Sequence, residues 1–317
     1  MERVLITGAG GFIGHHLVTR LKKDGHWVRG VDVKLPEFAR SDADEFELLD
    51  LRRWDSCLEA TRGIDQVYAL AADMGGMGFI SANHSRILHN NALINLHTMH
   101  AAVLNGVSRY FYSSSACVYP EYLQLQENIT PLTEEDALPA APQDAYGWEK
   151  LLTELLCGYY SGDYPIETRV LRFHNIYGPL GAYAGGREKA PAALCRKIAL
   201  AEKDGEIEIW GDGKQTRSFC YIDDCVEGIV RMMRSDFPGP LNMGSDRMVS
   251  IDDLARIILE HAGKPDVQIR HVDGPQGVRG RNSDNSRLLA TLNWAPQTTL
   301  EDGLAVTYDW ISAQVRR

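Results

Sequence analysis

The sequence has few cysteines, and their spacing is not that of a disulfide framework or a zinc site. The six cysteines stand at positions 57, 117, 157, 195, 220 and 225, without a Cys-x-x-Cys pair and without paired histidines nearby. Disulfide scaffolds and structural zinc sites both need closely spaced ligands. We therefore expect most of these cysteines to be small core residues, and we expect no bound metal.

A net positive charge and long apolar runs are also lacking. A formal net charge of −10 over 317 residues excludes the broad basic face that nucleic acids and anionic membranes require. No apolar run approaches the roughly 20 residues that cross a bilayer, and Val4–Ile6 breaks at once into glycines, unlike a signal peptide. We expect a cytoplasmic globular enzyme without nucleic-acid or membrane partners, and we find no linker, repeat or low-complexity segment.

Glycine is present where a dinucleotide-binding turn would need it. Val4–Thr7 is typical of a buried strand, Gly8, Gly11 and Gly14 follow directly, and a helical pattern begins at His15. A glycine turn that opens a helix points free N–H groups at a pyrophosphate, although the same glycines could merely make a tight turn. A second strand, Trp27–Val31, ends at Asp32, whose carboxylate suits a ribose diol.

The cofactor predicted from this unit is NAD, because Asp32 would repel the 2′-phosphate of NADP. Arg29 and Lys34 lie close enough in the sequence to keep NADP open. A third strand, Phe46–Leu49, leads into Asp50 and Leu51, where the acid either lies beside the adenine edge or simply holds a turn. Asp65–Ala72 is a further apolar strand, and the Met74–Gly78 loop after it is either a ligand contact or a flexible connection.

A cluster of hydroxyls and one thiol, Ser113–Pro120, follows the apolar run Arg109–Tyr112. Ser115 and Cys117 are two residues apart, so we expect their side chains on the same side of an extended strand. Tyr146 and Lys150 come later at a spacing of i and i+4, which puts them on one helix face. We expect the Lys150 ammonium and an oxidised nicotinamide to lower the pKa of the Tyr146 phenol, so that it can move a hydroxyl proton. Such a pair alone is common on surface helices, and its position downstream of a glycine turn gives it weight.

After the strand Thr168–Phe173 the alternation of strands and helices fades. Cations gather in the second half, at Arg187, Lys189 and Lys197 and again at Arg279 and Arg281. They suit a diphosphate if they converge, and otherwise they are solvated surface charges. We predict an α/β fold with a Rossmann-type doubly wound parallel sheet in residues 1–177, a returning segment near 216–242, and a smaller discontinuous substrate lobe mainly in 178–317.

The chain resembles the extended short-chain dehydrogenase/reductases, the NAD-dependent nucleotide-sugar epimerases and dehydratases. The resemblance rests on the Gly8/Gly11/Gly14 turn, Asp32, Ser115 and the Tyr146/Lys150 pair. It implies that serine and tyrosine bind the sugar C4 hydroxyl, that lysine holds the nicotinamide ribose, and that C4 becomes a transient ketone. The predicted cofactor contacts are Gly8, Gly11, Phe12, Ile13, Gly14, Asp32, Asp50, Leu51, Ala71, Tyr146, Lys150 and Phe173.

The C4 ketone would acidify the protons on C3 and C5, so the reaction depends on nearby acids and bases. The dehydratases carry Asp-Glu after the catalytic serine or threonine, whereas this chain has Ala116 and Cys117. Inverting a ring carbon needs one group to remove a proton and another to supply one from the opposite face. Cys117 and Lys189 can fill these roles, because neighbouring cations favour a thiolate and desolvation favours a neutral amine. A structural cysteine and a phosphate-binding lysine stay open alternatives.

Six long segments resemble the GDP-mannose 3,5-epimerase family. They are Ala71–Ile80, Ser114–Pro120, Pro142–Gly147, Arg172–Pro179, Gly185–Pro191 and Gly277–Asp284. This resemblance implies Cys117 and Lys189 as the acid/base pair, GDP-mannose or related GDP-hexoses as substrate, GDP-L-galactose as product with GDP-L-gulose as a by-product, and a homodimer. The substrate contacts that we predict are Gly75, Met77, Ser115, Asn175, Glu188, Lys189, Lys197, Gln215, Arg217 and Arg281.

Two other functions remain open from the sequence. A GDP-sugar 4,6-dehydratase or C4-epimerase would use Cys117 only for packing. An NAD-sensing regulator would have the same fold without the chemistry, and it would have no need for the full set of Ser115, Tyr146 and Lys150.

Overall fold

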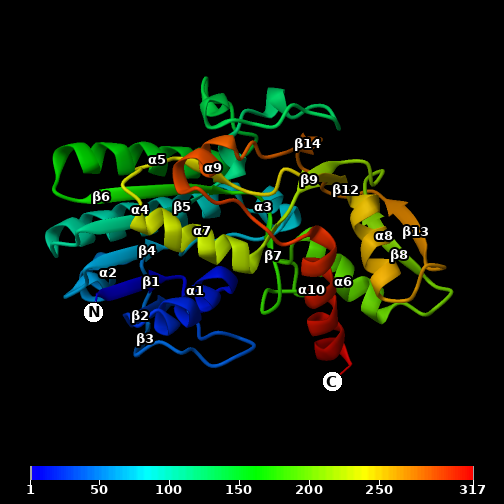
Figure 1. Ribbon diagram of the computed structural model, residues 1–317, viewed down its shortest axis with the longest axis horizontal. Helices are drawn as coiled ribbons and strands as arrows, with labels where there is room; N and C mark the ends of the chain where they lie inside the picture. Colours follow the sequence, from blue (N-terminus) through cyan, green and yellow to red (C-terminus); the bar gives the residue numbers. More distant parts are fainter. Residues whose placement is uncertain (1, 317) are drawn as a thin grey trace.

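The computed structural model describes residues 2–316 and is built around one seven-stranded parallel sheet (Figure 1). The strand order is β11-β6-β5-β4-β1-β2-β3, and every neighbouring pair is parallel. This is the doubly wound sheet that the sequence predicts. The strands are β1 (Arg3–Thr7), β2 (Trp27–Asp32), β3 (Glu45–Leu48), β4 (Gln66–Ala69), β5 (Arg109–Ser115), β6 (Glu167–Phe173) and β11 (Leu241–Met243).

Helices cover both faces of this sheet because its strands are apolar on both sides. In β1, Val4 and Ile6 belong to one buried cluster and Leu5 to the other. One face packs against α1 (Phe12–Lys23) and α7 (Ile222–Arg234). The other packs against α2 (Trp54–Thr61), α4 (His84–Leu104) and α5 (Ala145–Asp163).

A smaller group of elements lies at the opposite end of the molecule in Figure 1, where α10 packs against α6 and α8 beside the β8–β13 pair. The remaining strands form two further small sheets, β10-β7 and β12-β9-β14. These elements are α6 (Ala190–Leu200), α8 (Ile251–His261), α10 (Leu300–Val315), β7 (Ile176–Tyr177), β8 (Glu206–Trp210), β9 (Thr216–Ser218), β10 (Cys220–Tyr221), β12 (Met248–Ser250), β13 (Gln268–Val272) and β14 (Gly280–Arg281).

Short helices complete the chain. They are α3 (Met77–Ala82), α9 (Ser286–Leu292) and three 3₁₀ turns, Ala116–Val118, Glu121–Leu123 and Glu134–Ala137. The late segments α7 and β11 pack on the main sheet, although the domain boundaries 1–177 and 178–317 stay a prediction. No helix within residues 2–316 is long and apolar enough to span a bilayer.

The topology places the predicted site residues at one edge of the sheet. Strand β1 lies between β2 and β4, so successive crossovers leave it in opposite directions and open a crevice at the carboxyl ends of the strands. The glycine turn follows β1, the methionine-glycine loop follows β4, and the serine cluster ends β5. The predicted strand to Ala72 is shorter in the structure, because β4 ends at Ala69.

Candidate active site

The glycine turn is a cradle too tight for side chains. Gly8 has a φ of +72°, and a Cβ on it would lie 2.9 Å from Ala71 N. A Cβ on Gly14 would lie 2.2 Å from Gly8 O, and one on Gly10 would lie 2.1 Å from Lys34 O. The hydroxyl of Thr7 accepts hydrogen bonds from the N–H groups of Leu70 and Ala71 at 3.1 Å, which fixes β4 beside the turn. Backbone atoms therefore lie too close to these glycines to admit a Cβ.

Asp32 ends β2 beside this cradle, where its carboxylate accepts a hydrogen bond from Gly10 N at 3.0 Å. Burial raises the pKa of the Asp32 carboxyl, and backbone N–H groups act against that rise. Arg29, which kept NADP open, is turned away and paired with Glu45 at 2.9 Å. Asp50 is bound to Arg52 at 2.6 Å and accepts from Arg52 N, so its contacts are those of a turn acid.

The other predicted cofactor contacts lie at the same edge of the sheet. Phe12 and Ile13 open α1, and Leu51 follows β3. Ala71 follows β4 and Phe173 ends β6. All of them stand at or just beyond the carboxyl ends of neighbouring parallel strands.

Ser115 and Cys117 reach the site in a way that the sequence did not indicate. An extended strand through both residues was expected, with the two side chains on one side of it. Instead β5 ends at Ser115, and Cys117 lies in the 3₁₀ turn Ala116–Val118. The reason is a local cap, because the Ser115 hydroxyl accepts a hydrogen bond from Cys117 N at 3.2 Å.

Gly147 allows α5 to lie against this turn. A Cβ on Gly147 would lie 2.1 Å from Cys117 O. The helix starts at the N-cap Asp144, whose side chain accepts from Gly147 N at 2.9 Å. This close approach brings Tyr146 beside Ser115 and Cys117, all three of which influence one another electrostatically or by hydrogen bonding.

Tyr146 and Lys150 share the buried face of α5, as their spacing predicts. The Lys150 ammonium donates to Ser113 O at 2.9 Å and lies 5.5 Å from the centre of the Tyr146 ring. Burial acts against the lowering of the tyrosine pKa that we expect from Lys150 and an oxidised nicotinamide. Burial raises the pKa of Tyr146 well above its ordinary value, Cys117 adds to the rise, and a hydrogen bond with Ser115 acts against it. The ammonium is held on a carbonyl rather than on the phenol oxygen.

Lys189 is the N-cap residue of α6 and is partly buried. Burial lowers the pKa of its ammonium, and Cys117 acts in the opposite direction. The protonation of Lys189 therefore depends on the charge of Cys117, the other predicted acid/base group. A neighbouring cation would also favour the neutral amine, but Arg187 is paired with Asp73 at 3.1 Å. Burial alone therefore favours the neutral amine.

The loop before Lys189 is tied to the loop after β4. Gly76 N donates to Arg187 O at 3.1 Å, and a Cβ on Gly76 would lie 2.4 Å from Glu188 O. The Arg187 guanidinium lies 4.0 Å from the centre of the Phe79 ring. We call these contacts between residues 73–79 and 186–188 the interloop clasp.

Two arginines stand side by side at the site without carboxylate partners among residues 2–316. Arg217 in β9 and Arg281 in β14 are directly paired in register. Arg217 donates only to carbonyl groups, of Thr216, Gln276 and Val278, and burial together with Arg281 lowers its pKa to about 9. Arg281 donates to Cys117 Sγ at 3.3 Å. Adjacent, unneutralised guanidinium groups make an anion site.

Of the remaining predicted substrate contacts, Asn175 and Gln215 lie beside β9, Gly75, Met77 and Glu188 lie on the clasp, and Lys197 lies in α6. Asn175 has a φ of 47° between β6 and β7 and donates to Ser218 O at 2.8 Å. Gln215 donates to Trp210 O, and its buried Oε1 has no hydrogen-bond partner among the described residues. Lys197 donates to Glu208 O at 2.6 Å. Glu188 accepts from Gly186 N, Gly75 lies against Phe79, and Met77 begins α3.

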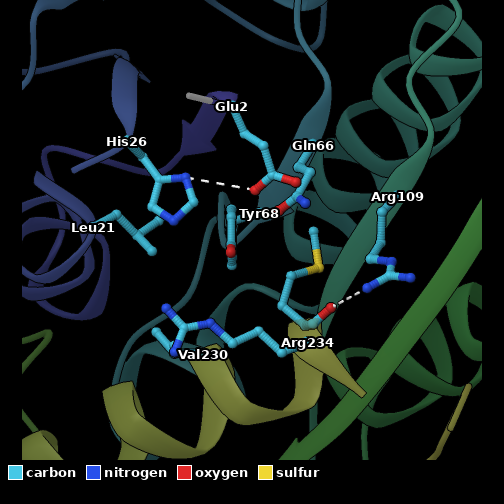
Figure 2. Close-up of a pocket in the computed structure, with 9 residues that line it drawn as sticks. Glu2, Leu21, His26, Gln66, Tyr68, Arg109, Val230 and Arg234 are labelled. Atoms are coloured by element: carbon cyan, nitrogen blue, oxygen red, sulfur yellow. Dashed lines mark hydrogen bonds and ion pairs between the residues drawn. The ribbon is translucent and has the colours of Figure 1, made fainter. Parts of the chain in front are cut away.

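A cavity of about 180 Å³ lies at a different place, near the amino ends of the sheet strands (Figure 2). Its walls include Gln66, Tyr68 and Arg109, and the Tyr68 hydroxyl points into it. Its charged groups are already paired, His26 with Glu2 and Arg109 with Glu167. None of the predicted site residues lines it. Within residues 2–316, no group of three or more His, Cys, Asp or Glu side chains could hold a metal ion.

The glycine cradle, the Ser115/Tyr146/Lys150 set and the sheet order define a dinucleotide-binding protein of the short-chain dehydrogenase/reductase type. The sequence profile of the NAD dependent epimerase/dehydratase family matches residues 4–244. The chain belongs to this family. The backbone cradle at Gly8–Gly14 and the carboxylate of Asp32 fit NAD, and the pairing of Arg29 with Glu45 leaves that arginine unavailable to a 2′-phosphate.

Curated relatives give a narrower comparison. The GDP-mannose 3,5-epimerase 1 of Oryza sativa subsp. japonica is 55% identical over 99% of this chain and 83% of its own length. The GDP-mannose 3,5-epimerase of Arabidopsis thaliana is 53% identical over the same shares. Among solved structures, a UDP-glucose 4-epimerase from Thermotoga maritima superposes with a TM-score of 0.87 at 24% identity, covering 99% of both chains. The last comparison shows the fold.

Several residues at the site were not singled out from the sequence. Asp73 lies inside a segment that resembles the epimerases, so that segment was a signal, whereas its partner Arg187 was named only as one of the gathered cations. Gln124 gave none, because its partner Arg281 is 157 positions away. Gly147 was part of a motif, but its contact with Cys117 O depends on how α5 packs.

Proposed function

We propose that this protein inverts C3 and C5 of GDP-mannose through a transient C4 ketone and gives GDP-L-galactose. One observation carries the proposal beyond the family. Cys117 follows Ser115 in a tight turn, has an arginine on its sulfur, and influences the protonation of both Tyr146 and Lys189. A thiol and an amine coupled in this way are the two proton carriers that ring inversion needs.

Bound NAD would accept the C4 hydrogen as hydride and return it, so each turnover leaves the cofactor unchanged. Tyr146 would take the proton of the C4 hydroxyl, with Ser115 orienting that hydroxyl. Lys150, fixed on Ser113 O, would hold the nicotinamide ribose. Arg217 and Arg281 would bind the diphosphate between adjacent strands. The predicted contacts at Gly75, Met77, Asn175, Glu188, Lys197 and Gln215 would surround the rest of the GDP-sugar.

Cys117 and Lys189 would then work on opposite faces of the sugar ring. One removes the proton that the ketone has acidified, and the other supplies a proton from the opposite side. Inversion at C5 alone would release GDP-L-gulose, and inversion at both carbons gives GDP-L-galactose. The low lysine pKa that burial produces allows a neutral amine to act as base nearer to neutral pH.

The alternative reactions fit this site less well. A 4,6-dehydratase would need carboxyl groups in the turn after Ser115, where this chain has the buried Ala116 and the partly buried Cys117. A C4-epimerase would need neither a thiol nor an arginine on that thiol. An NAD-sensing regulator would have no use for a reactive serine, tyrosine and lysine together.

We further propose a cytoplasmic homodimer formed through α5. Trp148, Leu152, Leu155 and Tyr159 form a stripe at helical spacing, and their exposed fractions are 48%, 56%, 47% and 69%. The same helix carries Tyr146 and Lys150 on its buried face. A second copy of the chain can cover this stripe symmetrically. All six cysteines are free, which suits a reducing compartment.

The reaction can be tested by incubating the NAD-loaded protein with GDP-mannose in heavy water. We expect proton NMR to show deuterium at C3 and C5 together with inverted stereochemistry at both carbons. Inversion at C4 without exchange, loss of the C6 oxygen or an unchanged sugar would each contradict the proposal. Boiled protein serves as the control for exchange that needs no enzyme.

A further inference from the structure

Gln124 is fully buried and lies behind the arginine that contacts Cys117. Its Oε1 accepts a hydrogen bond from Arg281 Nε at 2.6 Å. Its Nε2 donates to the carbonyls of Tyr119 and Pro120, each at 3.1 Å. Every polar atom of the amide is therefore committed, and the orientation of the side chain is fixed by the turn that follows Cys117.

The backbone of Gln124 holds the same strand. Its carbonyl accepts hydrogen bonds from Arg279 N at 2.9 Å and Gly280 N at 3.2 Å. Gln124 thus fixes both the start of β14 and the guanidinium that projects from its second residue. From this position of the strand, Arg281 donates to Cys117 Sγ at 3.3 Å.

Two arginines separated by one residue, Arg279 and Arg281, differ in whether carboxylates neutralise them. Arg279 is neutralised by two carboxylates, those of Asp212 and Glu127. Arg281 has no carboxylate partner among residues 2–316, and a neutral amide fills the place where an acid would neutralise it. An amide oxygen orients a guanidinium as a carboxylate does but leaves its full positive charge to act elsewhere.

We propose that Gln124 is a positioning residue that holds Arg281 against Cys117 without neutralising it, and so stabilises the thiolate of the proton-transfer step. This inference rests on the proposed role of Cys117. When the cysteine acts as acid, its S–H bond breaks, a C–H bond forms at the ring carbon, and the sulfur keeps the electron pair. When it acts as base, the C–H bond breaks and the S–H bond forms. In both directions the charged form is the thiolate that Arg281 faces.

The test is the reactivity of Cys117 in the NAD-loaded protein without substrate. Cys117 is the only cysteine in the chain that is not buried, so iodoacetamide labelling reports on it, with Cys117→Ser as background. Gln124→Glu keeps the shape of the side chain and neutralises Arg281. We expect labelling at neutral pH to slow about tenfold and the pH of half-maximal rate to move upward, because the thiolate is the reacting form.

Gln126→Glu is the matched control, because it adds the same charge two positions away on an exposed side chain. We expect its labelling rate to stay within about twofold of the wild type. Gln124→Met removes the acceptor without adding a buried charge, and it serves if the glutamate variant does not fold; we expect it to label several-fold more slowly than the wild type. Unchanged labelling in a folded Gln124 variant, or equal slowing in Gln126→Glu, would overturn the inference. A wild type that fails to epimerise GDP-mannose would instead overturn the proposed function.

Discussion

The carboxylate of Asp73, just after β4, lies 3.1 Å from the guanidinium of Arg187, two residues before Lys189. Asp73 also pairs with Arg86 at 2.9 Å and accepts from Asn90 at 2.9 Å. The interloop clasp therefore connects the sheet edge with the loop that presents the proposed amine. Its centre is one carboxylate with three polar partners.

Asp73→Asn is expected to loosen the clasp and to leave the rest of the fold intact. The position of Lys189 would become less well defined, so we expect kcat to fall about tenfold or more, as misplacement of a reacting group does. Exchange of C3 and C5 protons in heavy water measures this loss. Asp266 is exposed, and its side chain forms no hydrogen bond or ion pair within residues 2–316, so Asp266→Asn should exchange protons at the wild-type rate.

The clasp should also respond to acid. Burial tends to raise the pKa of the Asp73 carboxyl, but hydrogen bonds from Asn90, Arg187 and Arg86 outweigh it and hold the pKa below its ordinary value. A lowered folded-state pKa means that the ionised carboxylate stabilises the fold above the unfolded value of about 3.9 and that this contribution is lost as the pH falls through the folded value. The stability difference between wild type and Asp73→Asn, measured by urea unfolding, should be constant near neutrality and shrink in acid.

Gly147→Ala should disrupt catalysis through one methyl group. The new Cβ would lie 2.1 Å from Cys117 O, so either α5 or the thiol turn must move. We expect about 1 to 3 kcal/mol of destabilisation and a large loss of epimerisation. Gly158→Ala lies on the same helix with no atom within 4 Å of the added carbon and should be neutral or slightly stabilising. Equal behaviour of the two variants would contradict the packing argument.

Substitution of Cys117 or Lys189 should suppress proton exchange at C3 and C5 without preventing oxidation at C4. We expect Cys117→Ser and Lys189→Ala to lower deuterium incorporation at C3 and C5 by about 10² to 10⁴ fold, the usual contribution of a positioned acid or base. Both variants should still oxidise C4, which is visible as the near-ultraviolet absorbance of reduced cofactor. Retention of full epimerisation by both would show that other groups move the protons.

Gly10→Ala should weaken cofactor binding. Its Cβ would lie 2.1 Å from Lys34 O and 3.1 Å from Asp32 Cγ, which would displace the carboxylate at the end of β2. Titration calorimetry of the cofactor-free protein with NAD should show at least about tenfold weaker binding, a free-energy loss of about 1.4 kcal/mol. Gly162→Ala, with nothing near the added carbon, should bind NAD as the wild type does.

Leu152→Glu should prevent dimer formation. The leucine is 56% exposed in the middle of the proposed interface, so a charge there would face its own copy across a two-fold axis. Sedimentation velocity should give a dimer for the wild type and a monomer for the variant. Leu289→Glu changes an equally exposed leucine on α9, at 53%, and should leave the dimer intact.

The parts of the fold that were predicted from the sequence depend on local patterns. The turn after β1 needs glycine at fixed offsets, and β4, β5 and β6 contain apolar runs, although β4 ends three residues before the predicted end. The apolar spacing predicts α4 only from Asn90 onward, although the helix begins at His84, because its first turn is polar, with Ser85 and Arg86 exposed. The two-residue strands β7 and β10 are too short to produce a periodic pattern.

The parts of the site that were missed depend on contacts between distant segments. Gln124 meets Arg281, and Asp73 meets Arg187 across 114 positions. The spacing of Tyr146 and Lys150 also gave no sign that burial in the folded protein raises the pKa of Tyr146. The types and spacings of the residues could be read from the sequence, but their degree of burial could not be predicted from it.

The register of β9 and β14 affects how much a bound ligand stabilises the protein. Arg217 lies directly opposite Arg281 in register, and the two guanidinium groups repel each other. A bound diphosphate would weaken that repulsion, so the nucleotide sugar would serve as a counter-ion as well as a substrate. The segments around β9 and β14 should therefore become more resistant to proteases when GDP alone is bound, because a ligand that prefers the folded state adds to its stability. Substrate supply would then govern the lifetime of the enzyme as well as its rate.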